Sequence, residues 1–330
     1  MLVAGFLAGA MVVLAATLPV PLVALGPGPT YDTLSAVAGK PVVTVDGLPT
    51  YPTTGHLNMT TVSVTDKITL LNALGFWASP REQVVPRSVI FPPEQSDAQV
   101  EAKNSQDFEK SQLAAESAVT SELRIDAEPV VADVVDGSAA DGPLAVGDVL
   151  VSVGGQPVKN RDDVVARIRA VPAGASTAVV VRRDGTQKSV DVTPRKDDGG
   201  QQVIGVVVGS EPAKGKLTID LGGIGGPSAG LMFSLSLYDK LTPGSLTGGR
   251  FVAGTGALDV NGDVLGIGGI QFKLRAARDA GATVFLVPDV DCADAAKAAP
   301  DGLQLVKVSS LHDAVAALGR LSSGAPAPSC

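Results

Sequence analysis

Aromatic residues, histidines and an excess of basic residues are all lacking in this sequence. Phe, Trp and Tyr make up 4% of the 330 residues, histidine occurs twice, and 26 Lys and Arg are outnumbered by 34 Asp and Glu, which gives a net charge of −8. Such a chain lacks the basic surface that neutralises phosphate groups, so we expect no nucleic acid among its partners. Its length is too great for one typical core and predicts more than one domain.

Charge is also absent from the N-terminus. The first 25 residues, MLVAGFLAGAMVVLAATLPVPLVAL, contain no charged side chain, and such a run is long enough to cross about 30 Å of hydrocarbon as a helix. A cleavable signal peptide is the alternative, but its apolar region is shorter and ends at a small-x-small site. We therefore expect a single-pass membrane anchor over residues 1–25. The bulk of the chain is expected on one side of that membrane, outside the cytoplasm.

Cysteine is nearly absent as well. Cys292 and Cys330 are the two cysteines, and both lie in the last forty residues. Their spacing matches no metal-binding motif. In an exported domain such a pair can form a disulfide that ties the tail down, whereas in the cytosol both would remain thiols. A disulfide is the favoured interpretation, and a chance occurrence of two thiols is the alternative.

A strand-dense block occupies residues 124–196. PVVADVV, GDVLVSVGG, TAVVVRRDG and QKSVDVTP have the pattern of strands, RDDVVARIRAV predicts a helix between them, and R-D-G at 183–185 indicates a hairpin. With V-G-D-V-L at 146–150 and the turn Gly154-Gly155, the block resembles a PDZ domain. The resemblance implies that an extended peptide binds as an added strand at a sheet edge. A β-rich spacer that binds nothing is the alternative.

Further structure is predicted on both sides of this block. GPGPTYDTL at 26–34 has the composition of a linker, HLNMTTVSVT at 56–65 alternates like a strand, and residues 97–123 lack Gly and Pro and predict a long helix. The fold class expected is α+β or mixed α/β. The expected parts are a transmembrane anchor (1–25), a linker and extracytoplasmic segment with a long helix (26–123), a PDZ-like domain (124–196), a mixed α/β domain (203–321) and a tail (322–330).

A candidate nucleophile lies in the mixed α/β domain. The stretch GGIGGPSAGL at 222–231 places Ser228 in a glycine-rich frame that also reads G-x-S-x-G. This pattern is typical of the nucleophile elbow, whose Asp and His partners follow in chain order, and Asp289 and His312 satisfy that order. The context disfavours it, because a loop precedes the serine and His312 is expected on the surface of a terminal helix. The other histidine, His56, lies before the PDZ-like block.

A lysine can replace histidine as the base that activates a serine. It does so only when its amine is neutral, which requires burial in an apolar pocket that lowers its pKa by several units. Lys273 fits this condition, because it lies between Phe272 and Leu274 in the first turn of a predicted helix. The positive potential at a helix N-terminus further disfavours the ammonium form.

These residues belong to a set of motifs that resembles the proteolytic domain of the Lon (S16) peptidases. The motifs are GPSAG at 226–230, T-G at 255–256, N-G-D-V at 261–264, G-G-I-x-x-K at 268–273 and TVFLVP at 283–288. The resemblance implies that Ser228 is the nucleophile, Lys273 the general base and Thr255 a residue that helps to place the lysine amine. A helix opening at Pro227 would aim backbone N–H groups at an oxyanion. The glycines of LGGIGG at 221–226 would let a substrate strand approach closely.

The order of anchor, PDZ-like block and Lon-like domain resembles that of a PDZ-containing, Lon-like peptidase type of bacteria, particularly actinobacteria. No G-x-x-x-x-G-K-[ST] motif occurs in the sequence. We therefore expect ATP-independent hydrolysis of peptide bonds in unfolded or extended proteins, with no metal and no cofactor. The family resemblance also implies a homo-oligomer, commonly a hexamer. The alternatives are an inactive PDZ scaffold for envelope proteins and a protease that processes only its own chain.

Overall fold

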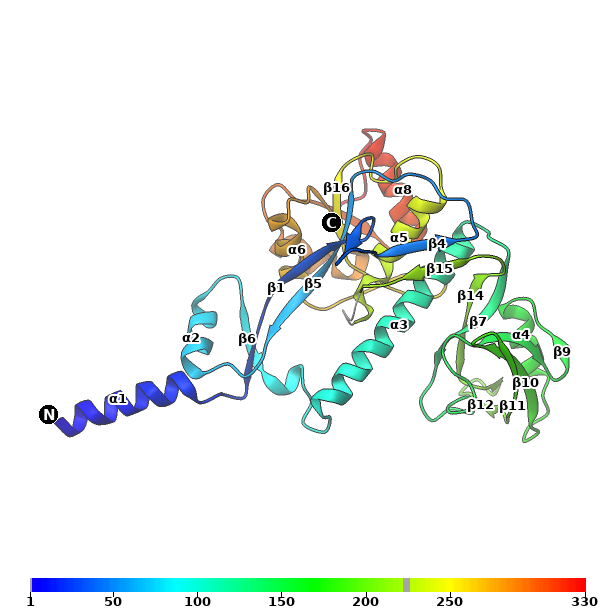
Figure 1. Ribbon diagram of the computed structural model, residues 1–330, viewed down its shortest axis with the longest axis horizontal. Helices are drawn as coiled ribbons and strands as arrows, with labels where there is room; N and C mark the ends of the chain where they lie inside the picture. Colours follow the sequence, from blue (N-terminus) through cyan, green and yellow to red (C-terminus); the bar gives the residue numbers. More distant parts are fainter. Residues whose placement is uncertain (1, 222–225) are drawn as a thin grey trace.

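The structure is a computed structural model that describes residues 2–221 and 226–330. A larger α/β part and a smaller β-rich part lie side by side, and both ends of the chain contribute to the larger part (Figure 1). The prediction that the glycines of 222–225 admit a substrate strand concerns residues outside the described ranges.

The residues before the β-rich part contribute short strands and helices. The long helix predicted over 97–123 is confirmed as α3, whose start is fixed by a capping box between Ser96 and Gln99. The elements are α1 (Leu2–Thr17), β1 (Leu22–Asp32), β2 (Ala36–Val37), β3 (Lys40–Pro41), β4 (Val43–Asp46), β5 (His56–Thr65), α2 (Leu70–Ala78), β6 (Gln83–Pro86), the 3-10 turn η1 (Arg87–Val89) and α3 (Asp97–Glu122).

The β-rich part corresponds to the PDZ-like block. Its strands have the order β11–β10–β8–β7–β14, with β9 beside β8, and α4 packs on a core that includes Leu150, Val179 and Val181. The predicted hairpin at 183–185 is confirmed, since Arg183 pairs with Thr186. The elements are β7 (Ala127–Val134), β8 (Val149–Val153), β9 (Gln156–Pro157), α4 (Arg161–Arg169), β10 (Thr177–Arg183), β11 (Thr186–Val192), β12 (Arg195–Lys196), β13 (Gln202–Val203) and β14 (Val206–Pro212).

The C-terminal residues alternate strands and helices, as the sequence predicts. Helices were expected to open at Pro227, at 271 and after Ser310, and α5, α6 and α8 lie at these places. The elements are β15 (Lys216–Ile219), η2 (Pro227–Ala229), α5 (Gly230–Leu241), β16 (Phe251–Gly254), β17 (Ala257–Leu258), β18 (Val264–Leu265), α6 (Ile270–Asp279), β19 (Val284–Pro288), η3 (Asp289–Asp291), α7 (Cys292–Ala298), β20 (Gln304–Val308) and α8 (Leu311–Ser322).

The central sheet of the larger part joins strands from both ends of the chain. Its order is β20–β19–β16–β5–β1–β6. The C-terminal strands and β5 run parallel, whereas β1 is antiparallel to β5 and β6. The sequence assigns residues 26–123 to a segment of their own, but in the structure their strands complete the sheet of the mixed α/β domain. The alternation of apolar and polar residues predicts which side chains share a face of a strand, but it does not predict which strand lies beside it.

The two faces of this sheet are covered by different helices. On β19, Val284 and Leu286 belong to the core beneath α3, α5 and α8. Phe285 and Val287 belong to a second core, with α6 and α7. All four side chains are at most 1% exposed, and their alternation is the two-residue period of a strand. The domain is therefore a helix–sheet–helix sandwich.

Two of the predicted boundaries differ from the structure. GPGPTYDTL is not a linker, because β1 runs through most of it and accommodates its prolines at a register shift between Pro27 and Thr30. Residues 206–212, predicted to lie in the mixed α/β domain, form β14, which pairs with β7 at the edge of the β-rich sheet.

The apolar N-terminus forms α1, a helix of 16 residues. Strand β1 begins at Leu22, so residues 22–25 of the predicted anchor belong to the sheet. Within the described ranges, no helix is both long enough and apolar enough to cross a membrane.

The predicted disulfide is present at the other end of the chain. Cys292, the first residue of α7, is bonded to Cys330. The N–H of Lys307 on β20 also donates to the carbonyl of Pro328, at 3.0 Å. The tail is therefore held against the domain by a covalent bond and a hydrogen bond.

Candidate active site

Ser228 lies at the entrance to a helix. The turn η2 leads directly into α5, with Pro227 in its first position, where the missing N–H costs no hydrogen bond. Gly226 before it has a φ of 112°, which side chains disfavour. In the described residues no side chain caps η2 or α5. The positive end of the helix dipole therefore lies at Ser228, where an oxyanion would form.

Helix α3 holds this turn in place from the side of the PDZ-like part. The hydroxyl of Ser111 donates to the carbonyl of Pro227 at 3.1 Å. The N–H of Gly226 donates to the carbonyl of Asn104 at 3.2 Å. These contacts link the turn that carries Ser228 to a helix that lies more than a hundred positions earlier, and sequence reasoning did not find them.

A second support comes from the end of strand β16. The carbonyl of Ser228 accepts hydrogen bonds from the N–H of Gly256 and from the hydroxyl of Thr255, each at 3.0 Å. A Cβ on Gly256 would lie 2.9 Å from Val264, which explains why the T-G motif needs its glycine. Thr255 is 1% exposed, so these bonds are shielded from water.

Lys273 approaches the same threonine from α6. It lies in the first turn of that helix, is 3% exposed, and its Nζ donates to Thr255 Oγ1 at 3.0 Å. Since Thr255 Oγ1 gives its own proton to Ser228 O, its lone pairs are free to accept from the amine. The three residues named from the sequence, Ser228, Thr255 and Lys273, are thus brought together.

Burial changes the acidity of this lysine. Loss of solvation lowers the pKa of Lys273 from 10.5 to about 8, and the carboxylate of Asp291 partly opposes the shift. A fraction of the molecules therefore carries a neutral amine near pH 7. A neutral lysine amine can accept a proton from a serine hydroxyl.

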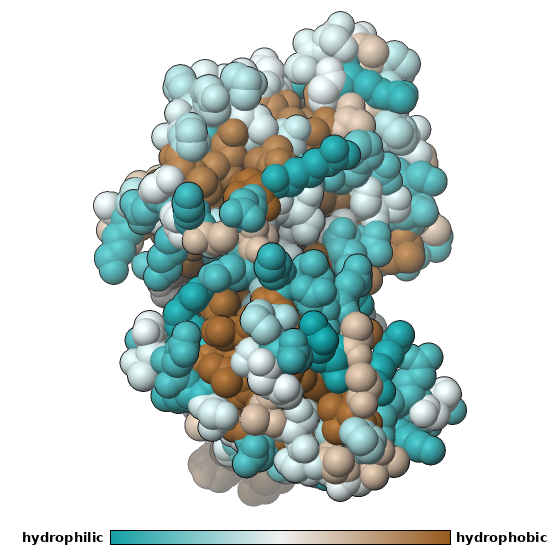
Figure 2. Space-filling model, turned by 90° about the vertical axis from the view of Figure 1, so that its right-hand side faces the viewer, coloured by the Kyte–Doolittle hydropathy of each residue, from teal (hydrophilic) through white to brown (hydrophobic). Residues whose placement is uncertain are grey.

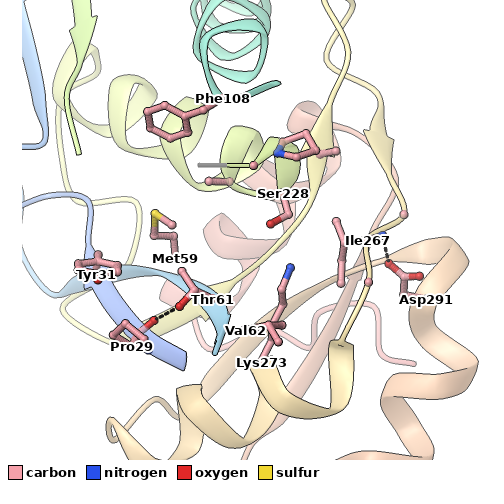
Figure 3. Close-up of a pocket in the computed structure, with 16 residues that line it drawn as sticks. Pro29, Tyr31, Met59, Thr61, Val62, Phe108, Ser228, Ile267, Lys273 and Asp291 are labelled. Atoms are coloured by element: carbon pink, nitrogen blue, oxygen red, sulfur yellow. Dashed lines mark hydrogen bonds between the residues drawn. The ribbon is translucent and has the colours of Figure 1, made fainter. Parts of the chain in front are cut away.

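Ser228 and Lys273 both line a cavity of about 830 Å³. Figure 3 shows their side chains entering it from η2 and α6. Within the described part of the chain no hydrogen bond joins Ser228 Oγ to Lys273 Nζ, and the amine donates to Thr255 Oγ1. The other lining residues are Pro29, Tyr31, Met59, Thr61, Val62, Phe108, Gly226, Pro227, Ala229, Ala257, Gly266, Ile267, Gly268 and Asp291.

One wall of the cavity comes from residues far earlier in the sequence. Tyr31 on β1, Met59 and Val62 on β5 and Phe108 on α3 line the cavity together with Ser228 (Figure 3). The alternation of HLNMTTVSVT predicts a strand, but only its parallel pairing with β16 brings it to the site. The wall is largely apolar and suits an apolar substrate side chain.

Asp291 shapes the opposite wall. Its carboxylate accepts a hydrogen bond from the N–H of Ile267 at 2.9 Å, which fixes the loop that precedes α6. It also stands next to Cys292, whose disulfide holds the start of α7. Asp291 has no motif around it that sequence reasoning could have used.

The two histidines are placed elsewhere. His312 is 76% exposed and pairs with Glu122 at 2.9 Å, a contact that raises its pKa. His56 pairs with Asp32 at 2.7 Å, and neither histidine lines the cavity. The expectation that His312 is a surface residue is confirmed. In the described ranges no group of His, Cys, Asp and Glu residues is arranged to hold a metal ion.

The PDZ-like part carries a second concave surface. A cavity of about 330 Å³ lies between α4, through Val164 and Ile168, and β14, through Val206 and Val208. β14 is an edge strand, so its outer backbone groups can pair with an added strand. Figure 2 views this end and shows apolar surface among hydrophilic side chains on the lower lobe. Sequence reasoning did not single out V-I-G-V at 203–206, which leads into β14 and lines this cavity.

Two family models match the chain where these surfaces lie. The model of the PDZ domain matches residues 130–183. The model of the Lon protease (S16) C-terminal proteolytic domain matches residues 222–318, the range that contains Ser228, Thr255 and Lys273.

Individual relatives are similar over short stretches. A protein of Pseudomonas fluorescens named "Probable periplasmic serine endoprotease DegP-like" is 45% identical over 58 residues, which are 18% of this chain and 12% of that protein. The Lon protease of Clostridioides difficile is 41% identical over 63 residues, 19% of this chain and 8% of that protein. The chain therefore spans a small fraction of the length of these relatives.

Among solved structures, the PDZ domain of the SdrC-like protein of Listeria monocytogenes is 20% identical. The match covers 24% of this chain and 86% of that one, with a TM-score of 0.23. From the two family models, the chain contains a PDZ domain and a Lon-type (S16) proteolytic domain, which is a serine peptidase domain.

Proposed function

We propose that the chain is a serine endopeptidase in which Ser228 is the nucleophile and Lys273 the general base. The observation that carries this proposal is the buried amine of Lys273, held by Thr255 in the cavity that Ser228 lines. Among the described residues no carboxylate forms a hydrogen bond with this buried amine. Such burial is costly, and strongly perturbed groups of this kind cluster at functional sites. A purely structural role would be served better by an apolar side chain.

The mechanism follows from the placement of these groups. The neutral amine of Lys273 takes the hydroxyl proton of Ser228 as its Oγ attacks the scissile carbonyl carbon. The oxyanion that forms is stabilised at the positive end of η2 and α5. The ammonium of Lys273 then gives its proton to the leaving amine, and an ester on Ser228 remains. Water, deprotonated by the same lysine, releases the acid and restores the serine.

Thr255 positions the base in this scheme. Its hydroxyl accepts one hydrogen of the Lys273 amine and donates its own to the Ser228 carbonyl. The amine is thereby oriented while its lone pair stays available for the serine proton. The contact also ties the base and the nucleophile to one point at the end of β16.

The proposed substrates are unfolded or extended proteins, and the PDZ domain is proposed to bind them. The edge strand β14 and the apolar groove beside α4 support peptide binding by strand addition. We also propose that cleavage needs no ATP, because the sequence has no G-x-x-x-x-G-K-[ST] motif to hold its phosphates. Assembly into a hexamer stays a prediction, which sedimentation of the purified chain tests.

We further propose that residues 1–25 attach the chain to a membrane, with the folded parts outside the cytoplasm. The absence of charge in this stretch and the exposure of its apolar side chains support attachment. The Cys292–Cys330 disulfide supports an oxidising compartment. Carbonate extraction of membranes and protease treatment of intact cells test the two statements separately.

Cleavage of casein by the full chain without ATP tests the proposed activity. The parent chain and His312→Ala are expected to cut, whereas Ser228→Ala and Lys273→Met are expected to remain folded and inactive. Added ATP is expected to leave the rate unchanged. If none of the chains cuts and peptides still bind, the PDZ scaffold is favoured. A self-cleaved band that Ser228→Ala abolishes, with casein intact, favours self-processing.

A further inference from the structure

Helix α2 carries an apolar face that the fold leaves uncovered. Its inner side packs through Ala73 and Phe76 on the small core around Ala24 and Ile68. Four large apolar side chains lie on its outer side: Leu70, Leu71, Leu74 and Trp77 are 44%, 46%, 51% and 78% exposed. At 3.6 residues per turn they fall within about 120° of the helix circumference, so they form one continuous surface.

The sequence around this face has the charge pattern of a membrane interface. No charged residue occurs between Lys67 and Arg81. These two basic side chains flank the helix at its ends, and Arg81 is paired with Asp279. Long basic side chains can reach the headgroups from the edge of an apolar patch. Tryptophan is enriched at the boundary between headgroups and hydrocarbon. The helix has nine residues, about 14 Å at 1.5 Å per residue, which is too short to span the hydrocarbon core of a bilayer.

The position of α2 beside α1 indicates what covers this face. The N–H of Val20, just after α1, donates to the carbonyl of Ile68, just before α2, at 2.9 Å, and Pro19 forms a bridge with Thr69. Both helices lie at the end of the molecule away from the PDZ domain (Figure 1). The exposed apolar side chains of α1 include Phe6, Leu7, Met11, Val12, Val13 and Leu14. They point in all directions around the helix, which suits a lipid surrounding better than one protein partner.

We propose that α2 is a second membrane contact, a short helix that inserts Leu71, Leu74 and Trp77 into the interfacial layer of the bilayer at the base of α1. Strand β5 carries Met59 and Val62 into the catalytic cavity and leads directly into α2. Docking of α2 therefore fixes the height and orientation of the cavity relative to the membrane. A single flexible attachment through α1 would leave that orientation free.

The chain contains its own reporter for this proposal, because Trp77 is its one tryptophan. The full chain is mixed with phosphatidylcholine vesicles that contain lipids brominated on the acyl chains. We expect the emission of Trp77 to shift to shorter wavelength, to be quenched by the brominated lipids and to be protected from acrylamide. Replacing both Leu71 and Leu74 by Asp is expected to reduce the quenching at least about tenfold, since half-exposed leucines lose their transfer free energy.

The control introduces an aspartate in place of an exposed apolar side chain at the other end of the molecule. Val135 in the PDZ domain is 53% exposed, and Val135→Asp is expected to leave the quenching unchanged. A chain that sediments with vesicles while Trp77 stays unquenched would show that α1 binds alone, and would overturn the proposal. A short-wavelength emission that depends on protein concentration and needs no vesicles would overturn it in favour of a second copy of the chain. Casein cleavage, measured separately, does not enter these outcomes.

Discussion

Replacing Lys273 by methionine is expected to abolish cleavage and to stabilise the fold. In the folded chain the pKa of Lys273 is lowered from 10.5 to about 8. Each pKa unit is worth about 1.4 kcal/mol, so the protonated lysine costs about 3 kcal/mol at pH 6. The variant loses the hydrogen bond to Thr255, worth about 1 kcal/mol. The free energy of unfolding is therefore expected to rise by about 2 kcal/mol at pH 6.

The increase in the free energy of unfolding caused by Lys273→Met should also depend on pH, and it should become smaller as the pH rises. Between about pH 8 and pH 10.5 the unfolded chain holds a proton on Lys273 that the folded chain has released. The stability of the parent consequently rises with pH in this window. The methionine variant lacks this contribution, so its advantage shrinks through the same window and is lost above pH 10.5.

Urea unfolding at pH 6 and pH 9.5 measures both effects. Lys297→Met is the matched control, because that lysine is 76% exposed and should show neither the gain nor its pH dependence. A Lys273→Met variant that is less stable than the parent at pH 6, or whose advantage is equal at both pH values, would refute the claim that Lys273 is a buried amine with a lowered pKa.

Three further perturbations test other parts of the site. Thr255→Val should lower kcat on peptide substrates about 10- to 100-fold, because one hydrogen bond to a charged group is lost. Thr255→Ser should restore kcat. If kcat of Thr255→Val stays within a factor of two of the parent, Thr255 has only a packing role. Phe108→Ala should raise KM several-fold for peptides with a large apolar residue at the cleaved bond, and little for those with a small one; an equal loss for all peptides would contradict the apolar wall. Replacing Cys292 and Cys330 by serine opens a loop of 38 residues and should cost up to about 4 kcal/mol in urea unfolding, whereas an unchanged midpoint would show that the bond does not hold the tail.

Which residues meet at the site was more predictable than what surrounds them. The motifs around Ser228, Thr255 and Lys273 have physical explanations. Pro227 suits a first helical turn, and Gly256 is needed because Val264 lies too close for a side chain there. The burial of Lys273 could be inferred from its apolar neighbours. Local sequence pointed to Ser228 and Lys273, and the resemblance to the Lon peptidases added Thr255. In the structure Thr255 is hydrogen-bonded to the Ser228 carbonyl and to the Lys273 amine.

The apolar wall of the cavity could not be predicted from the sequence, because it depends on the pairing of strands that are far apart in the chain. Nothing in HLNMTTVSVT states that β5 will lie beside β16, so Met59 and Val62 could not be assigned to the site. GPGPTYDTL was predicted to be a linker from its composition, but it forms most of β1, in which a register shift accommodates its prolines. The last strand of the PDZ domain, β14, was assigned to the wrong neighbour.

The central claim is that Lys273 activates Ser228 as a nucleophile. The most direct test is the rate at which a peptidyl p-nitrophenyl ester acylates the full chain as a function of pH, with the modified residue identified by mass spectrometry. The account predicts an adduct on Ser228 whose rate of formation rises with pH to a plateau, with a midpoint near the Lys273 pKa of about 8, and no such rise in Lys273→Met. An adduct on another residue, or equal rates in Lys273→Met and the parent, would contradict it.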